Sequence, residues 1–258
     1  MDPHSRISLA DIFALQEVAA KRNLEVSDRL QQAFATLSDC IGLGYEILHG
    51  MTFVAEKQTV LRAFAGDALS HVLVGFRVAL WGDLPESMSI LRGATESAAQ
   101  LLYVVENNLY ALAVSEFASK KFKRIKFENV LHNLGETGKA MAQSYGRISN
   151  LATHSTVSRL AQAEYEIDGE TYDRFGFAID ANAAHLPAYH SLLVAQLVIY
   201  ALAKAHQPEH QSWGARALAV LQGSKLVCQR WFDEENKLES QGSDTAEAVR
   251  PAAAETRE

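Results

Sequence analysis

The sequence has little cysteine, little proline and no long uninterrupted hydrophobic run. Two of its 258 residues are cysteines, Cys40 and Cys228, and neither belongs to a Cys-x-x-Cys pair. Both lie in apolar stretches with helical spacing, so we expect buried free thiols in a reducing compartment. This pattern excludes a small fold held together by disulfides and leaves hydrophobic packing as the source of stability.

A secretion signal and a membrane span are also missing from the pattern. The first residues, MDPHSRISLADIF, do not place a basic region before an apolar one. Apolar runs elsewhere are interrupted by Arg, Gly, His or Gln well before the roughly 20 residues that a membrane-spanning helix needs. We therefore expect no contact with a membrane and a cytoplasmic location.

Positive charge is not in excess. The chain carries 24 Lys and Arg against 31 Asp and Glu, a formal net charge of −7, so any contact with nucleic acid needs a local basic patch. The sequence contains no Walker loop, no Gly-x-Gly-x-x-Gly turn and no Gly-x-Ser-x-Gly elbow. It has no pair of Glu-x-x-His motifs, and Pro208 interrupts the spacing of His206 and His210, so we expect no metal and no cofactor.

Hydrophobic residues make up 48% of the chain and recur mainly at the 3.6-residue spacing of helices. The first half predicts successive helices with stops at WGDLPES and ENNLY, and a further helix over about 126–144. Two long helices are predicted over about 181–206 and 211–237. We expect an all-α, multi-helix bundle in a single domain that comprises residues 1–238.

Two segments depart from the helical pattern. EYEIDGETYDRFGFAID contains Asp168-Gly169 between alternating residues, which predicts one short β-hairpin or an irregular insertion near 163–180. Large apolar side chains are scarce over 239–258. Such a segment does not offset the entropy lost on ordering, so we expect a disordered C-terminal tail there.

Two predicted helices carry aligned polar residues. ILRGATESAAQLLYVV places Arg92, Glu96 and Tyr103 on one face, where Arg92 and Glu96 form either a structural ion pair or the wall of a pocket. GDALSHVLVGFRVALW places Asp67 and His71 four residues apart. Asp67 either orients His71 as a catalytic base or belongs with it to a solvated stripe.

YGRISNLATHS is the segment with the sharpest chemical interpretation. Arg147 and His154 are seven residues apart, so they share a face if the segment is helical. Arginine holds a phosphate with two hydrogen bonds, and histidine transfers protons near neutral pH, a combination that suits metal-independent cleavage of RNA. Ser149 and Asn150 offer further hydrogen bonds. The alternative interpretation is a capped turn between helices.

SKKFKRIKFEN is the densest basic cluster of the sequence. Lys121, Lys123 and Arg124 alternate with the aromatic residues Phe122 and Phe127. This mixture either holds a nucleic-acid backbone or is a solvated connector whose phenylalanines point inward.

The order of these motifs resembles an uncharacterised family of bacterial helical proteins. In that family a Leu-Arg-x-x-x-Glu helix precedes a Tyr-x-x-x-Ser-x-x-x-x-His segment, and the likeness covers roughly residues 55–205. The matching positions are Leu91, Arg92, Glu96, Tyr145, Ser149 and His154.

More remotely, the chain is similar to the HEPN superfamily (higher eukaryote and prokaryote nucleotide-binding). Many HEPN proteins are RNases of toxin–antitoxin and phage-defence systems, and they carry Arg, four to six residues, and then His. Arg147 and His154 match this spacing at its upper limit, whereas Ile148 departs from the polar residue that usually follows the arginine. The resemblance implies a homodimer, with RNA or a nucleotide as the ligand.

The leading hypothesis is a HEPN-like protein with a polar pocket that acts as a metal-independent endoribonuclease. His154 is then the acid or base, and Arg147 binds the phosphate. The alternatives are a non-catalytic helical interaction module and a small-molecule or nucleotide-binding module. The expected pocket residues are Arg92, Glu96, Tyr145, Arg147, Ser149 and His154.

Overall fold

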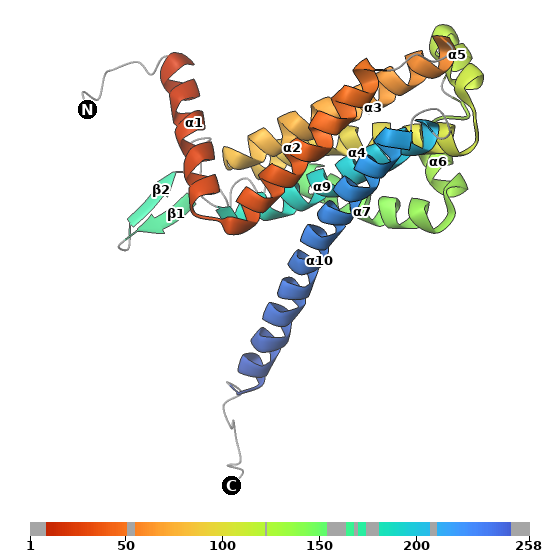
Figure 1. Cartoon of the computed structure of the whole chain (residues 1–258). Coiled ribbons are helices and arrows are strands. Elements are labelled where there is room, and N and C mark those ends of the chain that lie inside the picture. Colours follow the sequence, from red (N-terminus) through yellow and green to blue (C-terminus); the bar gives the residue numbers. More distant parts are fainter. Residues whose placement is uncertain are drawn as a thin grey trace.

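The computed structural model describes residues 9–50, 55–121, 123–153, 164–167, 170–173, 181–206 and 211–248. In these ranges, nine helices and one two-stranded sheet are found, and the helices pack into a bundle from which α1 and the end of α10 project (Figure 1). The prediction of an all-α multi-helix bundle is confirmed.

The helices of the first half are α1 (Leu9–Glu25), α2 (Asp28–His49), α3 (Ala55–Leu80) and α4 (Leu84–Glu106). The remaining helices are α5 (Tyr110–Ser119), α6 (Phe127–Asn133), α7 (Gly135–Thr153), α9 (Ala181–His206) and α10 (Gln211–Ala248).

Side chains fix the start of two helices. Ser27 Oγ accepts a hydrogen bond of 3.3 Å from the backbone nitrogen of Leu30, and Asp83 Oδ1 accepts one of 3.2 Å from that of Glu86. Gly82 has a φ of 88° and turns the chain between α3 and α4, at the predicted stop. This short connection lets α3 and α4 pack along each other.

Helices α4 and α9 form the centre of the bundle. α4 contacts α3, α6, α7 and α9, and α9 also contacts α2, α3 and α10. Leu91 and Leu101 of α4 and Leu192 of α9 are fully buried, and each contributes about 1.5–3 kcal/mol through the hydrophobic effect. A Cβ at Gly75 would lie 2.8 Å from Leu91 Cγ, so glycine allows α3 to approach α4 closely.

Two helices of the described part are long and apolar enough to cross a membrane. They are α3 and the part of α9 that spans Ala184–His206, and they bury 56% and 61% of their most apolar windows within the bundle. A core helix of a soluble bundle meets the same criterion, so this finding is weak evidence for a membrane. The cytoplasmic location stays a prediction.

Helices α6 and α7 differ from the single helix predicted over about 126–144. Gly135, at φ 57°, interrupts the helical path after Leu134, because positive φ ends an α-helix. α7 then continues to Thr153, beyond the predicted end. The segment predicted as a turn after residue 144 therefore contributes to the last helical turns of α7.

The antiparallel strands β1 (Glu164–Ile167) and β2 (Glu170–Asp173) form the predicted hairpin, with Tyr165 opposite Tyr172. The two residues between the strands, Asp168 and Gly169, and the rest of the predicted insertion lie outside the described residues.

Helix α10 is longer than predicted. It continues to Ala248, beyond the predicted end at about residue 237. The domain boundary at residue 238 and the disordered tail over 239–258 stay predictions. Once a helix is nucleated in an apolar segment, each added residue gains a hydrogen bond at low entropic cost, and Glu and Ala favour this propagation. Figure 1 shows the C-terminal part of α10 extending away from the bundle.

Candidate functional site

The buried helix α4 reaches solvent along one narrow stripe, which we call the α4 stripe. Arg92, Gly93, Glu96 and Gln100 are partly exposed, whereas their neighbour Leu91 is fully buried. Residues three and four apart lie on the same face of a helix, so these four form one continuous strip. The α4 stripe is the floor of the candidate site.

Tyr145 of α7 joins Arg92 and Glu96 at one side of the stripe. Glu96 Oε1 lies 3.4 Å from Arg92 Nε and accepts a hydrogen bond of 2.6 Å from the Tyr145 hydroxyl. The Arg92 guanidinium carbon lies 5.5 Å from the centre of the Tyr145 ring, within cation–π range. The structure therefore brings together three residues that were predicted from two separate motifs.

The surroundings keep Tyr145 protonated and Arg92 charged. Burial raises the pKa of Tyr145, and its hydrogen bond to the Glu96 carboxylate raises it further. The pKa of Arg92 is raised by its electrostatic interaction with Tyr145 and also by Glu96. The side chains of Arg92 and Glu96 are 41% and 37% exposed, so a ligand can reach both charged groups.

Ser149 lies four residues after Tyr145 on α7, which places both on the same face. A hydrogen bond between their side chains lowers the pKa of Tyr145, against the larger effect of burial. Ser149 therefore lies beside the group formed by Arg92, Glu96 and Tyr145. Asn150 belongs to α7, but its side chain is outside the described part of the structure.

Arg147 lies on a different side of α7 from Tyr145. The two residues are separated by two positions, or about 200° of helical rotation. Arg147 is exposed, and its charge contributes to lowering the pKa of His190 on α9. His154 lies outside the described residues. The structure thus separates Arg147 from the Arg92–Glu96–Tyr145 group, which corrects the prediction that all four residues line one pocket.

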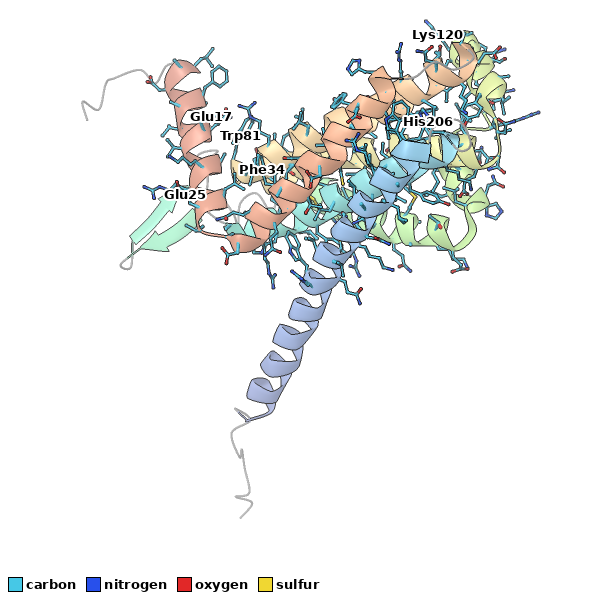
Figure 2. The ribbon with its side chains drawn as sticks, viewed as in Figure 1. Glu17, Glu25, Phe34, Trp81, Lys120 and His206 are labelled. Carbon is cyan, nitrogen blue, oxygen red and sulfur yellow. The ribbon has the colours of Figure 1, made fainter. Side chains whose placement is uncertain are left out.

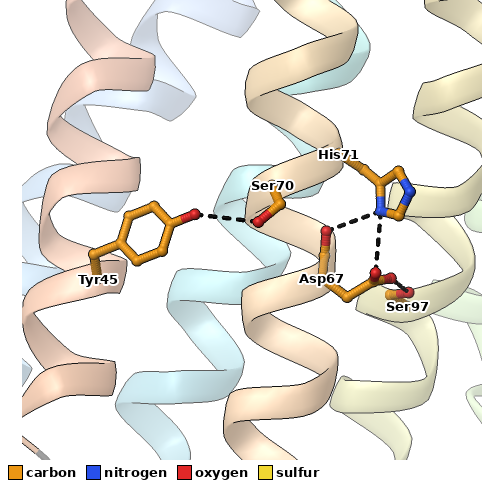
Figure 3. A network of polar contacts seen from close by, with 5 residues as sticks. All are labelled: Tyr45, Asp67, Ser70, His71 and Ser97. Carbon is orange, nitrogen blue, oxygen red and sulfur yellow. Dashed lines mark hydrogen bonds and ion pairs between the residues drawn. The ribbon is translucent and has the colours of Figure 1, made fainter.

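Asp67 and His71 of α3 border the other side of the stripe (Figure 3). His71 Nδ1 lies 2.9 Å from the backbone oxygen of Asp67 and 3.4 Å from its carboxylate, which accepts a hydrogen bond from the Ser97 hydroxyl. A Cβ at Gly93 would lie 3.7 Å from His71 Nε2. The second ring nitrogen of His71 therefore faces the stripe, while Asp67 orients the first.

The helical geometry of α4 puts the pair Asp67–His71 on one side of the α4 stripe and the group Arg92–Glu96–Tyr145 on the other side. Gly93 and Ser97 face α3. Arg92 comes one residue before Gly93, and Glu96 comes one residue before Ser97. Each therefore points about 100° away from its neighbour around the axis of α4. The sequence pattern does not connect His71 with Arg92 and Glu96, because they belong to different predicted helices. No local motif marks this pairing, since Gly93 touches the His71 ring only at ordinary van der Waals distance.

The basic segment between α5 and α6 is organised by the buried side chain of Glu116. Its carboxylate accepts hydrogen bonds from the backbone nitrogens of Lys123 at 3.0 Å, Arg124 at 2.9 Å and Ile125 at 3.3 Å. Glu116 is only 7% exposed. Because buried charge needs such partners, these bonds hold the segment in one conformation.

This basic segment borders the α4 stripe. Gln100 Nε2 donates a hydrogen bond of 2.9 Å to the backbone oxygen of Ile125. Phe127, at the start of α6, is buried and packs against Tyr145 with 4.6 Å between ring centres. The segment carries five exposed cationic residues. They are Lys120, Lys121, Lys123, Arg124 and Lys126, and Lys121, Lys123 and Arg124 among them were predicted as binding residues.

Both cysteines are buried free thiols, as predicted. Burial raises the pKa of Cys40 to about 12 and also raises that of Cys228, so neither is an activated nucleophile. In the part of the chain that the structure describes, no three His, Cys, Asp or Glu side chains come together as a metal-binding group.

The chain matches no family model, and no curated protein and no solved structure is significantly similar to it. The likeness to the HEPN superfamily therefore rests on the motifs of the sequence, and it stays a prediction.

Proposed function

We propose that the protein binds RNA across the α4 stripe and cleaves the phosphodiester backbone by acid–base chemistry. The convergence of Arg92, Glu96 and Tyr145 on one side of the stripe, with His71 on the other, carries this proposal. An anion-binding group, a carboxylate base and an imidazole acid are the side chains that this reaction requires.

In the proposed reaction, Arg92 and Tyr145 bind the non-bridging oxygens of the phosphate. Their hydrogen bonds to Glu96 are thereby released, and its carboxylate accepts the proton of the 2′-hydroxyl. The 2′-oxygen attacks phosphorus, the bond from phosphorus to the 5′-oxygen breaks, and protonated His71 donates a proton to that oxygen. The products are a 2′,3′-cyclic phosphate and a 5′-hydroxyl. Asp67 holds the His71 ring in place throughout.

The basic segment supplies contacts with neighbouring phosphates. Lys121, Lys123 and Arg124 are exposed beside the α4 stripe, and Glu116 fixes the backbone that carries them. Each phosphate neutralised on a single strand releases counterions, so three contacts give a slope of about −2 in log K against log salt. Salt dependence therefore measures the contribution of this segment.

The second part of the proposal is a homodimer. The α1 side chains Leu9, Phe13 and Val18 are 71%, 61% and 55% exposed, unusual for large apolar residues that cluster on one helix. Figure 2 shows Phe34, itself 51% exposed, on the side of the bundle from which α1 projects. Leu9 and Phe13 are four residues apart and share one face of α1. In the proposed dimer a second copy of the chain covers this α1 face together with Phe34.

Cleavage of a fluorescent single-stranded RNA in the presence of EDTA tests the proposal. The wild type is expected to form a 2′,3′-cyclic phosphate product, and Glu96→Gln to lower the rate at least 100-fold, the typical contribution of a general base. Glu128→Gln is the matched control, because Glu128 is exposed and its ion pair within the described part of the chain is with the exposed Lys126, at 3.5 Å. Absence of cleavage by the wild type contradicts the catalytic part of the proposal.

The double variant Arg147→Ala/His154→Ala distinguishes the two possible catalytic centres. If the α4 stripe is the centre, this variant keeps a rate within tenfold of the wild type. If the double variant loses activity while Glu96→Gln keeps it, catalysis belongs to Arg147 and His154.

RNA binding without cleavage is the second candidate function. The observation that favours it is the pairing of Arg92, Glu96 and Tyr145 with one another in the free protein, which leaves the carboxylate doubly engaged. Fluorescence anisotropy with the same RNA tests it. Binding that weakens in Lys123→Ala/Arg124→Ala, without any cleavage by the wild type, supports this function.

A further inference from the structure

A pocket of about 340 Å³ lies between α4, α7, α9 and α10. It is separate from the α4 stripe, because Arg92, Glu96, Tyr145 and His71 are not among its lining residues. Its volume lies at the lower end of the range for small-molecule sites, about 300–1,000 Å³. The lining residues that matter here are Ala140, Ser144, His190, Leu193, Leu197 and Leu221.

His190 is the polar group that makes this pocket more than an apolar hollow. The residue is 4% exposed, and its Nδ1 lies 3.0 Å from Ser144 Oγ. Its Nε2 is buried and has no hydrogen-bond partner among the described residues. An unpaired buried nitrogen costs free energy, so such groups in native proteins normally have a partner, which in a pocket is a ligand or an ordered water.

The charges around His190 restrict the partner to an uncharged group. Burial, together with the charge of Arg147, lowers the pKa of His190 to about 4, so the ring is neutral at physiological pH. Among the described residues, no Asp, Glu, Lys or Arg lines the pocket, and an ionised ligand placed there would lose its hydration without a counter-charge. The Ser144 hydroxyl either donates to Nδ1 or accepts from it, which makes Nε2 a donor or an acceptor.

A hydroxyl group suits both states of Nε2, because it donates and accepts hydrogen bonds. We infer that the pocket binds a small uncharged molecule with an apolar body and one hydroxyl group, and that this hydroxyl is hydrogen-bonded to His190 Nε2. Leu193, Leu197 and Leu221 contact the apolar body of the ligand. This inference is independent of the proposed RNA cleavage, because the two sites share no residue among those named for each.

Titration calorimetry of 2-naphthol binding to the full chain tests the inference. 2-Methoxynaphthalene is the matched probe, since it has a similar shape but no hydroxyl proton. The wild type is expected to bind one 2-naphthol per chain and to bind 2-methoxynaphthalene at least tenfold more weakly. In protein labelled with ¹⁵N-histidine, 2-naphthol shifts the Nε2 resonance of His190.

Two alanines on α7 provide matched variants. Ala140 is exposed and lines the pocket, whereas Ala142 is exposed on the same helix and does not line it. Ala140→Phe fills the pocket and is expected to weaken 2-naphthol binding at least tenfold, while Ala142→Phe binds like the wild type. His190→Leu, if circular dichroism shows it folded, loses the preference for the hydroxyl probe.

Three results overturn the inference. The first is no saturable binding of 2-naphthol by the wild type up to its solubility limit. The second is equal binding by Ala140→Phe and Ala142→Phe. The third combines two observations: light scattering shows a changed oligomeric state in Ala140→Phe, and the wild type does not bind 2-naphthol. That result shows that a second copy of the chain occupies the pocket face.

Discussion

The hydroxyl of Tyr145 on α7 donates a 2.6 Å hydrogen bond to Glu96 on α4 and so joins residues 49 positions apart in the sequence. Arg92 reaches the same carboxylate oxygen from one turn earlier on α4. The two donors fix the direction of the Glu96 carboxylate at the edge of the α4 stripe. Stability and proposed catalysis therefore depend on the same contact.

Tyr145→Phe is expected to lower the free energy of unfolding by about 1 kcal/mol. It removes the donor of a hydrogen bond to a charged acceptor, and the partial exposure of Glu96 limits the loss. Urea denaturation measures the change. Tyr45→Phe is the control with an effect below about 0.5 kcal/mol, because its 3.2 Å contact with Ser70 is exposed (Figure 3). Equal effects of the two substitutions contradict the assignment.

Glu116→Gln is expected to lower the free energy of unfolding by about 2 kcal/mol, because a buried carboxylate that accepts several backbone hydrogen bonds loses its charge. Hydrogen exchange at Lys123, Arg124 and Ile125 becomes faster in the same variant. Glu128→Gln removes a carboxylate that is exposed, so its effect stays below about 0.5 kcal/mol. Unchanged exchange at these three amides shows that Glu116 does not order the segment.

The pH dependence of stability reports the burial of His190. Its pKa is lowered from 6.5 to about 4 in the folded chain, so the unfolded chain binds the proton more readily. Stability is therefore full above about pH 6.5 and falls as the pH drops toward 4, by up to roughly 3 kcal/mol.

Urea denaturation at several pH values measures this loss, and His190→Leu removes it. His132→Gln is the matched control, because His132 is exposed. The linkage is refuted if wild type and His190→Leu lose stability equally between pH 6.5 and pH 4.

The proposed dimer predicts that Phe13→Asp produces monomers in light scattering, because a charge at the centre of an apolar interface is desolvated without a partner. Leu218→Asp on α10 is the matched control, since Leu218 is 57% exposed outside the α1 face. A wild type that is monomeric at all concentrations rules out the dimer.

Local rules predicted much of the fold. The turn at Gly82 and Asp83 and the shared face of Arg92 and Glu96 follow from neighbouring residues along the chain. The length of α7 was not predicted, because the polar residues after Ser144 are also typical of caps. Arg147 and Tyr145 were grouped because they belong to one short motif, although a continuous helix puts them on different sides.

The rest of the candidate sites depends on contacts between distant helices. His71 lies beside Gly93 only because α3 packs along α4, and a local pattern does not reveal such a pairing. His190 was not singled out, since a histidine on an apolar helix is usually a core residue. Its significance comes from Ser144 on another helix, which engages one ring nitrogen and leaves the other for a partner.

The single-turnover rate of RNA cleavage by Glu96→Gln, compared with that of the wild type in EDTA, tests the central claim most directly. The account predicts cleavage by the wild type to a 2′,3′-cyclic phosphate and a rate at least 100-fold lower in Glu96→Gln, with RNA binding retained. A Glu96→Gln protein that cleaves at the wild-type rate contradicts the assignment of the α4 stripe as the catalytic centre.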